Sequence, residues 1–259
     1  MSENVSGNVK LVAVSKPTIE GIETAEDLIA YCARVSNPSN QTNTETASKL
    51  LRYCIRNQHW SVFEMVNVVL EINTTRDIGR QILRHRSFQF QEFSQRYANP
   101  EQLGFTIREA RLQDKKNRQN SVETEDELLK KTWIAKQQQL LHELKLGYKW
   151  AIENGIAKEQ ARAILPEGIT NSRMYMNGSL RQWIHYCQLR MGNGTQKEHQ
   201  EIAKEAWAIL CKEFPFLADL KFDEAEEIKT LEKAVETSLK QVNEKYESKL
   251  STRIIQWFK

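Results

Sequence analysis

Apolar and polar residues alternate most clearly between residues 66 and 74. Val66, Val68, Leu70 and Ile72 would face one side of an extended chain, and the residues between them are mostly polar. Because successive side chains of a strand point to opposite faces of a sheet, this pattern predicts a half-buried strand. Apolar runs predict shorter strands at residues 10–15 and 169–176, and an aromatic, extended stretch is expected after residue 86.

Apolar residues at intervals of three and four predict helices over most of the remaining chain. Thr24 precedes acidic residues and an apolar stripe, which is the pattern of a capped helix over residues 24–36. The longest predicted helix covers residues 125–154 and is followed by Gly155, a residue suited to ending it. The other predicted helices cover residues 44–58, 75–85, 157–165, 179–189 and 195–214.

These elements predict an α+β fold that is mainly helical with a small, mostly antiparallel sheet. Residues 1–220 are expected to form a single domain, with a polar, irregular surface insertion at about residues 100–123. Residues 221–259 carry apolar residues at three- and four-residue steps with Lys and Glu between them. This pattern predicts an amphipathic helical tail that packs either on a partner, as in a coiled coil, or on its own chain.

The composition is that of an ordinary globular protein: 259 residues, 40% hydrophobic and 27% charged. No apolar run is long enough to cross a bilayer, and the polar N-terminus does not resemble a signal peptide. Cys32, Cys54, Cys187 and Cys211 are scattered and have no histidines at metal-ligand spacing. We therefore expect reduced thiols, a cytoplasmic protein and no metal site.

Positive charge is concentrated between Arg76 and Arg96. This segment holds five arginines against Asp77 and Glu92, a net +3, and the whole chain is also +3, so the remainder is neutral on balance. Arg76, Arg80 and Arg84 would share one face of a helix. Guanidinium groups repel one another unless an anion lies between them, so the segment predicts a phosphate site. The alternatives are a solvated basic face or ion pairs with other segments.

Residues 84–97 also carry a motif, Arg84-His85-Arg86 followed by seven residues and Ser94, which resembles the signature of flavin-dependent thymidylate synthases (the ThyX family). Four further elements occur in the family's order between Ala33 and about Ala208. They are Ala33-Arg34-Val35-Ser36, His59 to Glu64 (H-x-S-x-F-E), Ala161 to Pro166 (A-R-x-x-L-P) and a segment from Ser179 that ends in Leu189-Arg190. Residues 100–123 and the tail lie outside these elements.

The resemblance implies a ThyX-like fold and a methyltransferase activity. Such an enzyme methylates dUMP at C5 to give dTMP, with 5,10-methylenetetrahydrofolate as carbon donor and FAD, reduced by NADPH, as hydride carrier. It also implies a homotetramer whose active sites are shared between subunits.

The resemblance further assigns roles by position. Arg190 and His59 match catalytic positions, His59 as a residue near the flavin that holds water or contacts folate. Positions that match dUMP contacts are Gln81, Ile82, Leu83, Arg84, Glu92, Phe93, Ser94, Gln95, Arg96, Arg162 and Arg190. Positions that match FAD contacts are Ser36, Ser61, Glu64, Arg84, His85, Arg86, Glu92, Ser179, Arg181 and His185.

Two positions depart from the family pattern. Met65 stands where many members carry a second histidine, and Ser179 stands where others have Asn, with Asn177 two residues earlier. The flavin contact could come from either Ser179 or Asn177, and we assign it to Ser179.

The chemistry fits these assignments. Uracil C5 is a poor nucleophile until electron density enters the ring, and a permanently charged guanidinium such as Arg190 stabilises the resulting negative charge. None of the four cysteines lies in a sequence motif typical of a catalytic nucleophile, so no covalent thiol intermediate is expected. Ser94 and Arg96 alternate in an extended chain, so their side chains would point the same way. Ser94 could be proposed as a nucleophile, but no obvious base accompanies it except His85. We therefore take Ser94 as a hydrogen-bond ligand. His142 and His199 are expected at the surface; Trp133, Trp150, Trp207 and Trp257 are expected in the core or an interface.

Two other functions would use the same basic segment. A nucleic-acid-binding protein would need further basic and aromatic clusters, and the neutral remainder of the chain argues against it. Another dUMP-processing enzyme, such as a hydrolase, would need clustered acids to hold Mg²⁺, and none lies near the arginines in the sequence.

Overall fold

The structure is a computed structural model that describes residues 8–220. The chain forms two compact units, Met1–Ala218 and Asp219–Lys259, and only the first is described below. The predicted helical tail and Trp257 lie outside the described residues. Within the described residues, no helix is both long enough and apolar enough to span a membrane.

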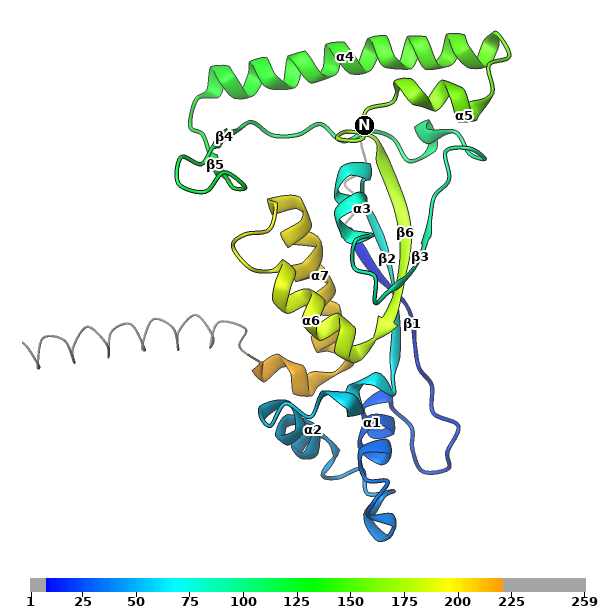
Figure 1. Cartoon of the computed structure of the whole chain (residues 1–259), viewed down its shortest axis with the longest axis vertical. Coiled ribbons are helices and arrows are strands. Elements are labelled where there is room, and N and C mark those ends of the chain that lie inside the picture. The colour runs from blue at the N-terminus through cyan, green and yellow to red at the C-terminus, as the bar shows by residue number, and fades with distance from the viewer. Residues whose placement is uncertain (1–7, 221–259) are drawn as a thin grey trace, which may run out of the picture. The chain divides into compact units, whose positions relative to one another are not determined.

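A four-stranded antiparallel sheet, in the order β1-β2-β6-β3, forms the centre of the unit (Figure 1). Its strands are β1 (Val9–Val14), β2 (Asn67–Thr75), β3 (Gln89–Glu92) and β6 (Asn171–Ser179). All three predicted strands are present, and the aromatic extended stretch supplies β3. The alternation seen in the sequence is real, because Val68, Leu70 and Ile72 are fully buried. The prediction of an α+β fold is confirmed.

The helices lie close to the predicted positions in the sequence. Thr24 and Asp27 form the capping box at the start of α1, and Gly155 has the positive φ (+73°) that ends α4. The predicted helices 24–36, 44–58 and 75–85 are shorter than expected and end at Ala33, Arg56 and Ile82, and 157–165 divides into α5 and a 3-10 turn. The helices are α1 (Ala25–Ala33), α2 (Ala47–Arg56), α3 (Arg76–Ile82), α4 (Glu127–Glu153), α5 (Lys158–Ala161), α6 (Leu180–Arg190) and α7 (Lys197–Glu213). The 3-10 turns used below are η2 (Trp60–Glu64) and η4 (Arg162–Ile164).

The core lies between the sheet and the pair α6 and α7, which pack side by side (Figure 1). Trp183 of α6 is fully buried, and its indole N–H donates to the carbonyl oxygen of Val68 at 3.0 Å. Ile202 and Leu210 of α7 are also buried. Burying these side chains removes large apolar areas from water, which stabilises the placement of both helices. The last turn of α6 thereby holds Arg190 beside the end of α3.

Residues 100–123 are more ordered than the sequence analysis predicted. They contain an antiparallel hairpin of β4 (Arg111–Gln113) and β5 (Ser121–Glu123). The carboxylate of Asp114 accepts hydrogen bonds from two loop amides, those of Lys116 (2.8 Å) and Asn117 (3.2 Å). These polar side chains satisfy the backbone of the turn locally. Apart from this hairpin and a 3-10 turn at Pro100–Gln102, the segment is irregular, and its being an insertion stays a prediction.

A glycine in β6 sets the position of the segment that carries the RHR motif. A Cβ atom at Gly178 would lie 2.5 Å from two ring carbons of Phe88, a buried side chain packed edge-on to Trp183. We predict that Gly178→Ala lowers the free energy of unfolding by about 1–3 kcal/mol, because the Phe88 ring must leave its position against Trp183, or β6 must shift, to admit the methyl group. Equilibrium urea unfolding would measure this. Gly168→Ala is the matched control, since nothing lies within 4 Å of its Cβ; equal losses in the two variants would contradict the prediction.

Candidate active site

A pocket of about 350 Å³ lies between η2, the turn after α3 and one face of α6. Arg181, His185 and Leu189 are spaced four residues apart on α6 and therefore line the same wall. Arg181 is bound to the carboxylate of Glu64 from η2 at 2.5 Å. The pocket therefore brings together four predicted flavin contacts from three separate segments: Glu64, His85, Arg181 and His185.

His85, the middle residue of the RHR motif, is bound to the predicted catalytic arginine. The Nε–H of Arg190 donates to Nε2 of His85 at 2.8 Å, so the imidazole proton is on Nδ1. Burial and the neighbouring charge of Arg190 lower the pKa of His85 to about 4. The imidazole is therefore neutral near pH 7, and it holds the Arg190 guanidinium by accepting from the Nε–H of that arginine.

The segment around η2 lies at the edge of this pocket. Trp60 packs edge-on against His185, with ring centroids 4.8 Å apart. His59 and Ser61, on either side of Trp60, are exposed, and the ring of His59 lies edge-on to Tyr53. Ser36 is also exposed and follows α1. The structure brings η2 to the pocket, but no described contact joins Ser36 to it.

Ser179 and Asn177 were the two alternatives for one flavin contact. Ser179 is buried and caps α6, where its hydroxyl accepts from the backbone N–H of Gln182 at 3.4 Å. In contrast, Oδ1 of Asn177 is buried without a hydrogen-bond partner among the described residues. An unpaired buried acceptor is costly unless a ligand supplies its donor. This geometry favours Asn177 over the assigned Ser179.

The basic segment is only partly available to an anion. Glu92 approaches Arg76 (3.6 Å) and Arg80 (3.8 Å), and Glu167 approaches the same two arginines. The alternative of ion pairs therefore holds for these two residues. Arg84 does not continue their helical face, because α3 ends at Ile82. Arg84 and Arg86 are exposed, and within residues 8–220 neither makes an ion pair.

The predicted phosphate ligands lie after β3. Residues 94–97 form a turn, closed by Tyr97 N–H donating to the Ser94 carbonyl at 3.1 Å, so the predicted extended alternation of Ser94 and Arg96 was wrong. Arg96 forms an ion pair with Glu159 (3.6 Å), and Arg162 donates to the Glu159 carbonyl (3.3 Å). Other predicted dUMP positions are more covered: Ile82 and Gln95 are buried, and Leu83 and Phe93 are half-buried.

Arg96 and Arg162 both contact Glu159, whereas Arg190 contacts His85. No hydrogen bond or ion pair in the described part of the chain links these two groups of residues.

The family model described as "Thymidylate synthase complementing protein" matches residues 18–216. The chain belongs to this family. The matched range includes residues 100–123, which lay outside the motifs that carried the resemblance.

Similar proteins agree with the family. A probable flavin-dependent thymidylate synthase of Paramecium bursaria Chlorella virus 1 is 52% identical over 82% of this chain and 97% of its own length. A flavin-dependent thymidylate synthase of Synechocystis sp. is 50% identical over 82% of this chain and 97% of its own length. The resemblance inferred from the motifs is confirmed.

A solved structure shares the fold of this family member. It is a UMP/dUMP methylase, PolB from Streptomyces cacaoi, bound with 5-Br dUMP. The two chains superpose with a TM-score of 0.67 at 21% identity, covering 84% of this chain and 94% of the other.

The structure adds two residues that the sequence analysis missed. His199 was expected at the surface, yet it is fully buried and bonded to the hydroxyl of Tyr186 at 3.0 Å. Tyr186 also lines the pocket and packs edge-on to His85. A signal was present in the sequence: His199 shares the helical stripe of Ile202, Ala203 and Ala206. His142 is exposed, as predicted.

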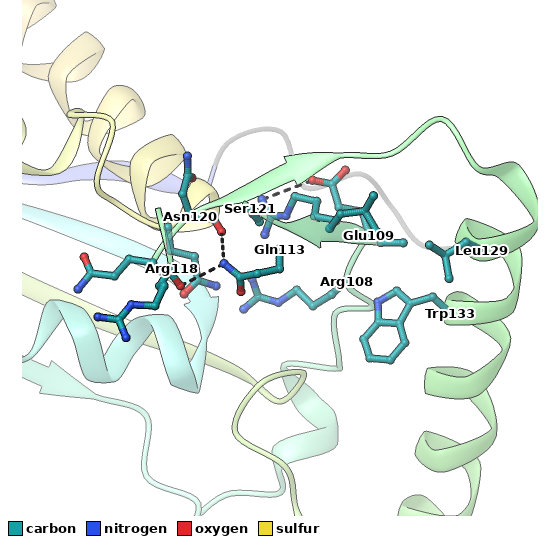
Figure 2. A pocket seen from close by; sticks show the side chains of 13 residues that line it. Arg108, Glu109, Gln113, Arg118, Asn120, Ser121, Leu129 and Trp133 are labelled. Carbon is teal, nitrogen blue, oxygen red and sulfur yellow. Dashed lines mark hydrogen bonds and ion pairs between the residues drawn. The ribbon is translucent and has the colours of Figure 1, made fainter. Parts of the chain in front are cut away.

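A second pocket, of about 560 Å³, lies beneath the β4–β5 hairpin (Figure 2). Arg108, Gln113 and Arg118 line it together with Trp133 from α4, as the close view shows. Trp133 and Trp150 are 44% and 61% exposed, so neither belongs to the core of the single chain. Their burial in an interface stays a prediction. Gln113 spans the loop by donating to the carbonyl oxygens of Arg118 (3.2 Å) and Asn120 (3.1 Å).

Proposed function

We propose that this protein is a flavin-dependent thymidylate synthase, which converts dUMP to dTMP with 5,10-methylenetetrahydrofolate as carbon donor and NADPH-reduced FAD as hydride carrier. Family membership supports the reaction. The observation that carries the assignment to this chain is the Arg190–His85 pair beside a pocket lined by predicted flavin contacts.

The residues of the pocket fit a flavin. Phe88 and Tyr186 supply aromatic walls, while Arg181, Gln182 and His185 supply polar and cationic groups. Aromatic walls with a few placed polar groups suit a planar ring system that carries phosphates. FAD bound there would supply the hydride chemistry, and the protein would supply binding and orientation.

Arg190 acts on the substrate in this proposal. Its guanidinium would stabilise the negative charge that develops on the uracil ring as C5 becomes nucleophilic. Neutral His85 holds the guanidinium in place through the 2.8 Å bond to its Nε. Ser94, Arg96 and Arg162 would bind the dUMP phosphate, and His59 would contact water or folate at the edge of the pocket.

We also propose a homotetramer with active sites shared between subunits. Family membership supports this assembly, because the resemblance implies active sites built across subunits. Large apolar side chains are exposed along α4, which favours burial against another copy. They include Leu128, Trp133, Leu140, Leu146 and Trp150. A cytoplasmic location is proposed because all four cysteines are free thiols.

Anaerobic product analysis with dUMP, methylenetetrahydrofolate and NADPH tests the reaction. The purified protein is expected to be yellow and to form dTMP only when all three compounds are present. A colourless protein that takes up no FAD and leaves dUMP unchanged would overturn the proposal.

A further inference from the structure

A series of polar side chains joined by hydrogen bonds, called the file below, runs from the pocket to the β4–β5 hairpin. It begins at the Tyr186 hydroxyl, which lies 3.0 Å from Nε2 of His199. Nδ1 of His199 lies 3.3 Å from the carboxamide oxygen of Gln81. The nitrogen of Gln81 donates to Gln196 at 2.8 Å, and the nitrogen of Gln196 donates to Glu198 at 2.9 Å. Only Gln81 among these residues was expected to contact a ligand.

The carboxylate at the end of the file sets the direction of every bond in it. Glu198 forms ion pairs with Arg108 (2.9 Å) and Arg111, two of the arginines that line the hairpin pocket (Figure 2). Burial raises the pKa of this carboxyl, but its own backbone N–H and Arg108 outweigh that effect, so the pKa is lowered and the group is ionised. An ionised carboxylate only accepts hydrogen bonds, so Gln196 must turn its nitrogen toward Glu198.

The remaining orientations follow step by step. With its nitrogen on Glu198, Gln196 presents its oxygen to Gln81, which must donate. The oxygen of Gln81 then faces His199 and requires a proton on Nδ1. A neutral imidazole carries one proton, so Nε2 is the acceptor for the Tyr186 hydroxyl. His199 is neutral because burial, with smaller effects of Arg190 and His85, lowers its pKa to about 3.

A carboxamide has two N–H donors, and the file uses only one of those on Gln81. We propose that His199 is a positioning residue for the dUMP site: its Nδ1–H holds the oxygen of Gln81 inward, so that the second N–H of Gln81 faces the nucleotide. This inference rests on the proposed function together with the family resemblance, in which the position of Gln81 matches a dUMP contact. The ligand atom would be an acceptor, as the oxygens of a phosphate are. A flipped carboxamide would instead present its oxygen to that anion.

The first measurement tests the direction of the file without any ligand. Nitrogen NMR of the protein labelled in histidine, with His199→Asn to assign the signal, reports which ring nitrogen carries the proton. We expect a neutral His199 protonated at Nδ1 at pH 7. A proton on Nε2 would reverse the direction of the file and overturn the proposal. This result does not depend on whether the protein is active.

The second measurement compares two substitutions. His199→Phe keeps an aromatic ring but removes both hydrogen bonds, whereas His199→Asn keeps an N–H donor at the place of Nδ1. We expect His199→Phe to weaken dUMP binding, measured calorimetrically, roughly fivefold to tenfold, and His199→Asn to stay within about threefold of the wild type. FAD content should be unchanged in both, and exposed His142→Gln is the matched control.

The outcomes separate this inference from the proposed function. If the wild-type protein binds no dUMP, the proposed function fails before any variant is compared. If the wild type binds dUMP, the inference is overturned when His199→Phe binds as tightly, or when His199→Asn is as weak as His199→Phe. Should His199→Phe fail to fold, the protonated nitrogen of wild-type His199 and the dUMP affinity of His199→Asn decide.

Discussion

An Arg190→Ala variant is expected to form dTMP about 10²- to 10³-fold more slowly than the wild type while retaining FAD. The reason is electrostatic: a guanidinium beside the uracil ring stabilises charge that exists only as C5 is activated, and removing one such group typically costs this much in rate. The 2.8 Å bond from Arg190 to neutral His85 holds that charge in a fixed position. Single-turnover dTMP formation, with flavin absorbance recorded on the same samples, measures both effects.

Arg173→Ala is the matched control for this experiment. Arg173 is an exposed arginine on β6 that pairs with Glu71 (3.7 Å) and Asn73 (2.9 Å) on β2. Its removal should leave the rate of dTMP formation unchanged. Arg190→Lys should fall between the wild type and Arg190→Ala, because it keeps a charge but not the planar fork. A normal rate in Arg190→Ala would show that the guanidinium does not activate the ring.

An Arg181→Met variant is expected to bind FAD roughly 10- to 100-fold more weakly. Arg181 lines the pocket one helical turn before His185, and Glu64 orients its guanidinium at 2.5 Å while leaving other N–H groups free. Each hydrogen bond from a charged group to a ligand is worth about 1.5–3 kcal/mol. Methionine keeps the apolar stem of the side chain, so the change isolates the charge. FAD titration of the apoprotein, followed by flavin fluorescence, gives the dissociation constant.

Two comparisons make the Arg181 result specific. Arg173→Met changes the same side chain type at an exposed position and should leave FAD affinity within about twofold of the wild type. Thermal unfolding of both variants without FAD should give similar midpoints, because the Arg181–Glu64 pair is largely exposed and contributes little to stability. If Arg181→Met binds FAD normally, the pocket is not the flavin site.

Much of the fold follows from local patterns in the sequence. The alternation over residues 66–74 identified β2, and the cap at Thr24 marked where α1 begins. These signals are reliable because the period of side chains and the hydrogen bonds of a helix end depend only on residues close together in the chain. Motifs in a fixed order also identified the family and four of the residues that line the pocket, namely Glu64, His85, Arg181 and His185.

Two of the errors concern partners that are distant in the chain, and a third concerns strands too short to show a pattern. Nothing near Arg76 or Arg80 in the sequence indicated that Glu167 would help to neutralise their charges. His199 was taken for a surface residue because a single polar side chain on an apolar stripe can be either solvated or bonded inside, and its partner Gln81 lies 118 residues away. The hairpin at residues 111–123 was missed because its strands are three residues long, too short for any period to appear.

The sequence by itself determined the family and the order of the main strands and helices along the chain, and it proposed the residues that would contact phosphate and flavin. Only the tertiary structure decided which of the arginines are already neutralised, that Arg190 is held by His85, and that buried His199 orients Gln81. The physical reason is that periodicity records which face a residue occupies, whereas the charge and hydrogen bonding of a side chain depend on the neighbours that packing brings to it.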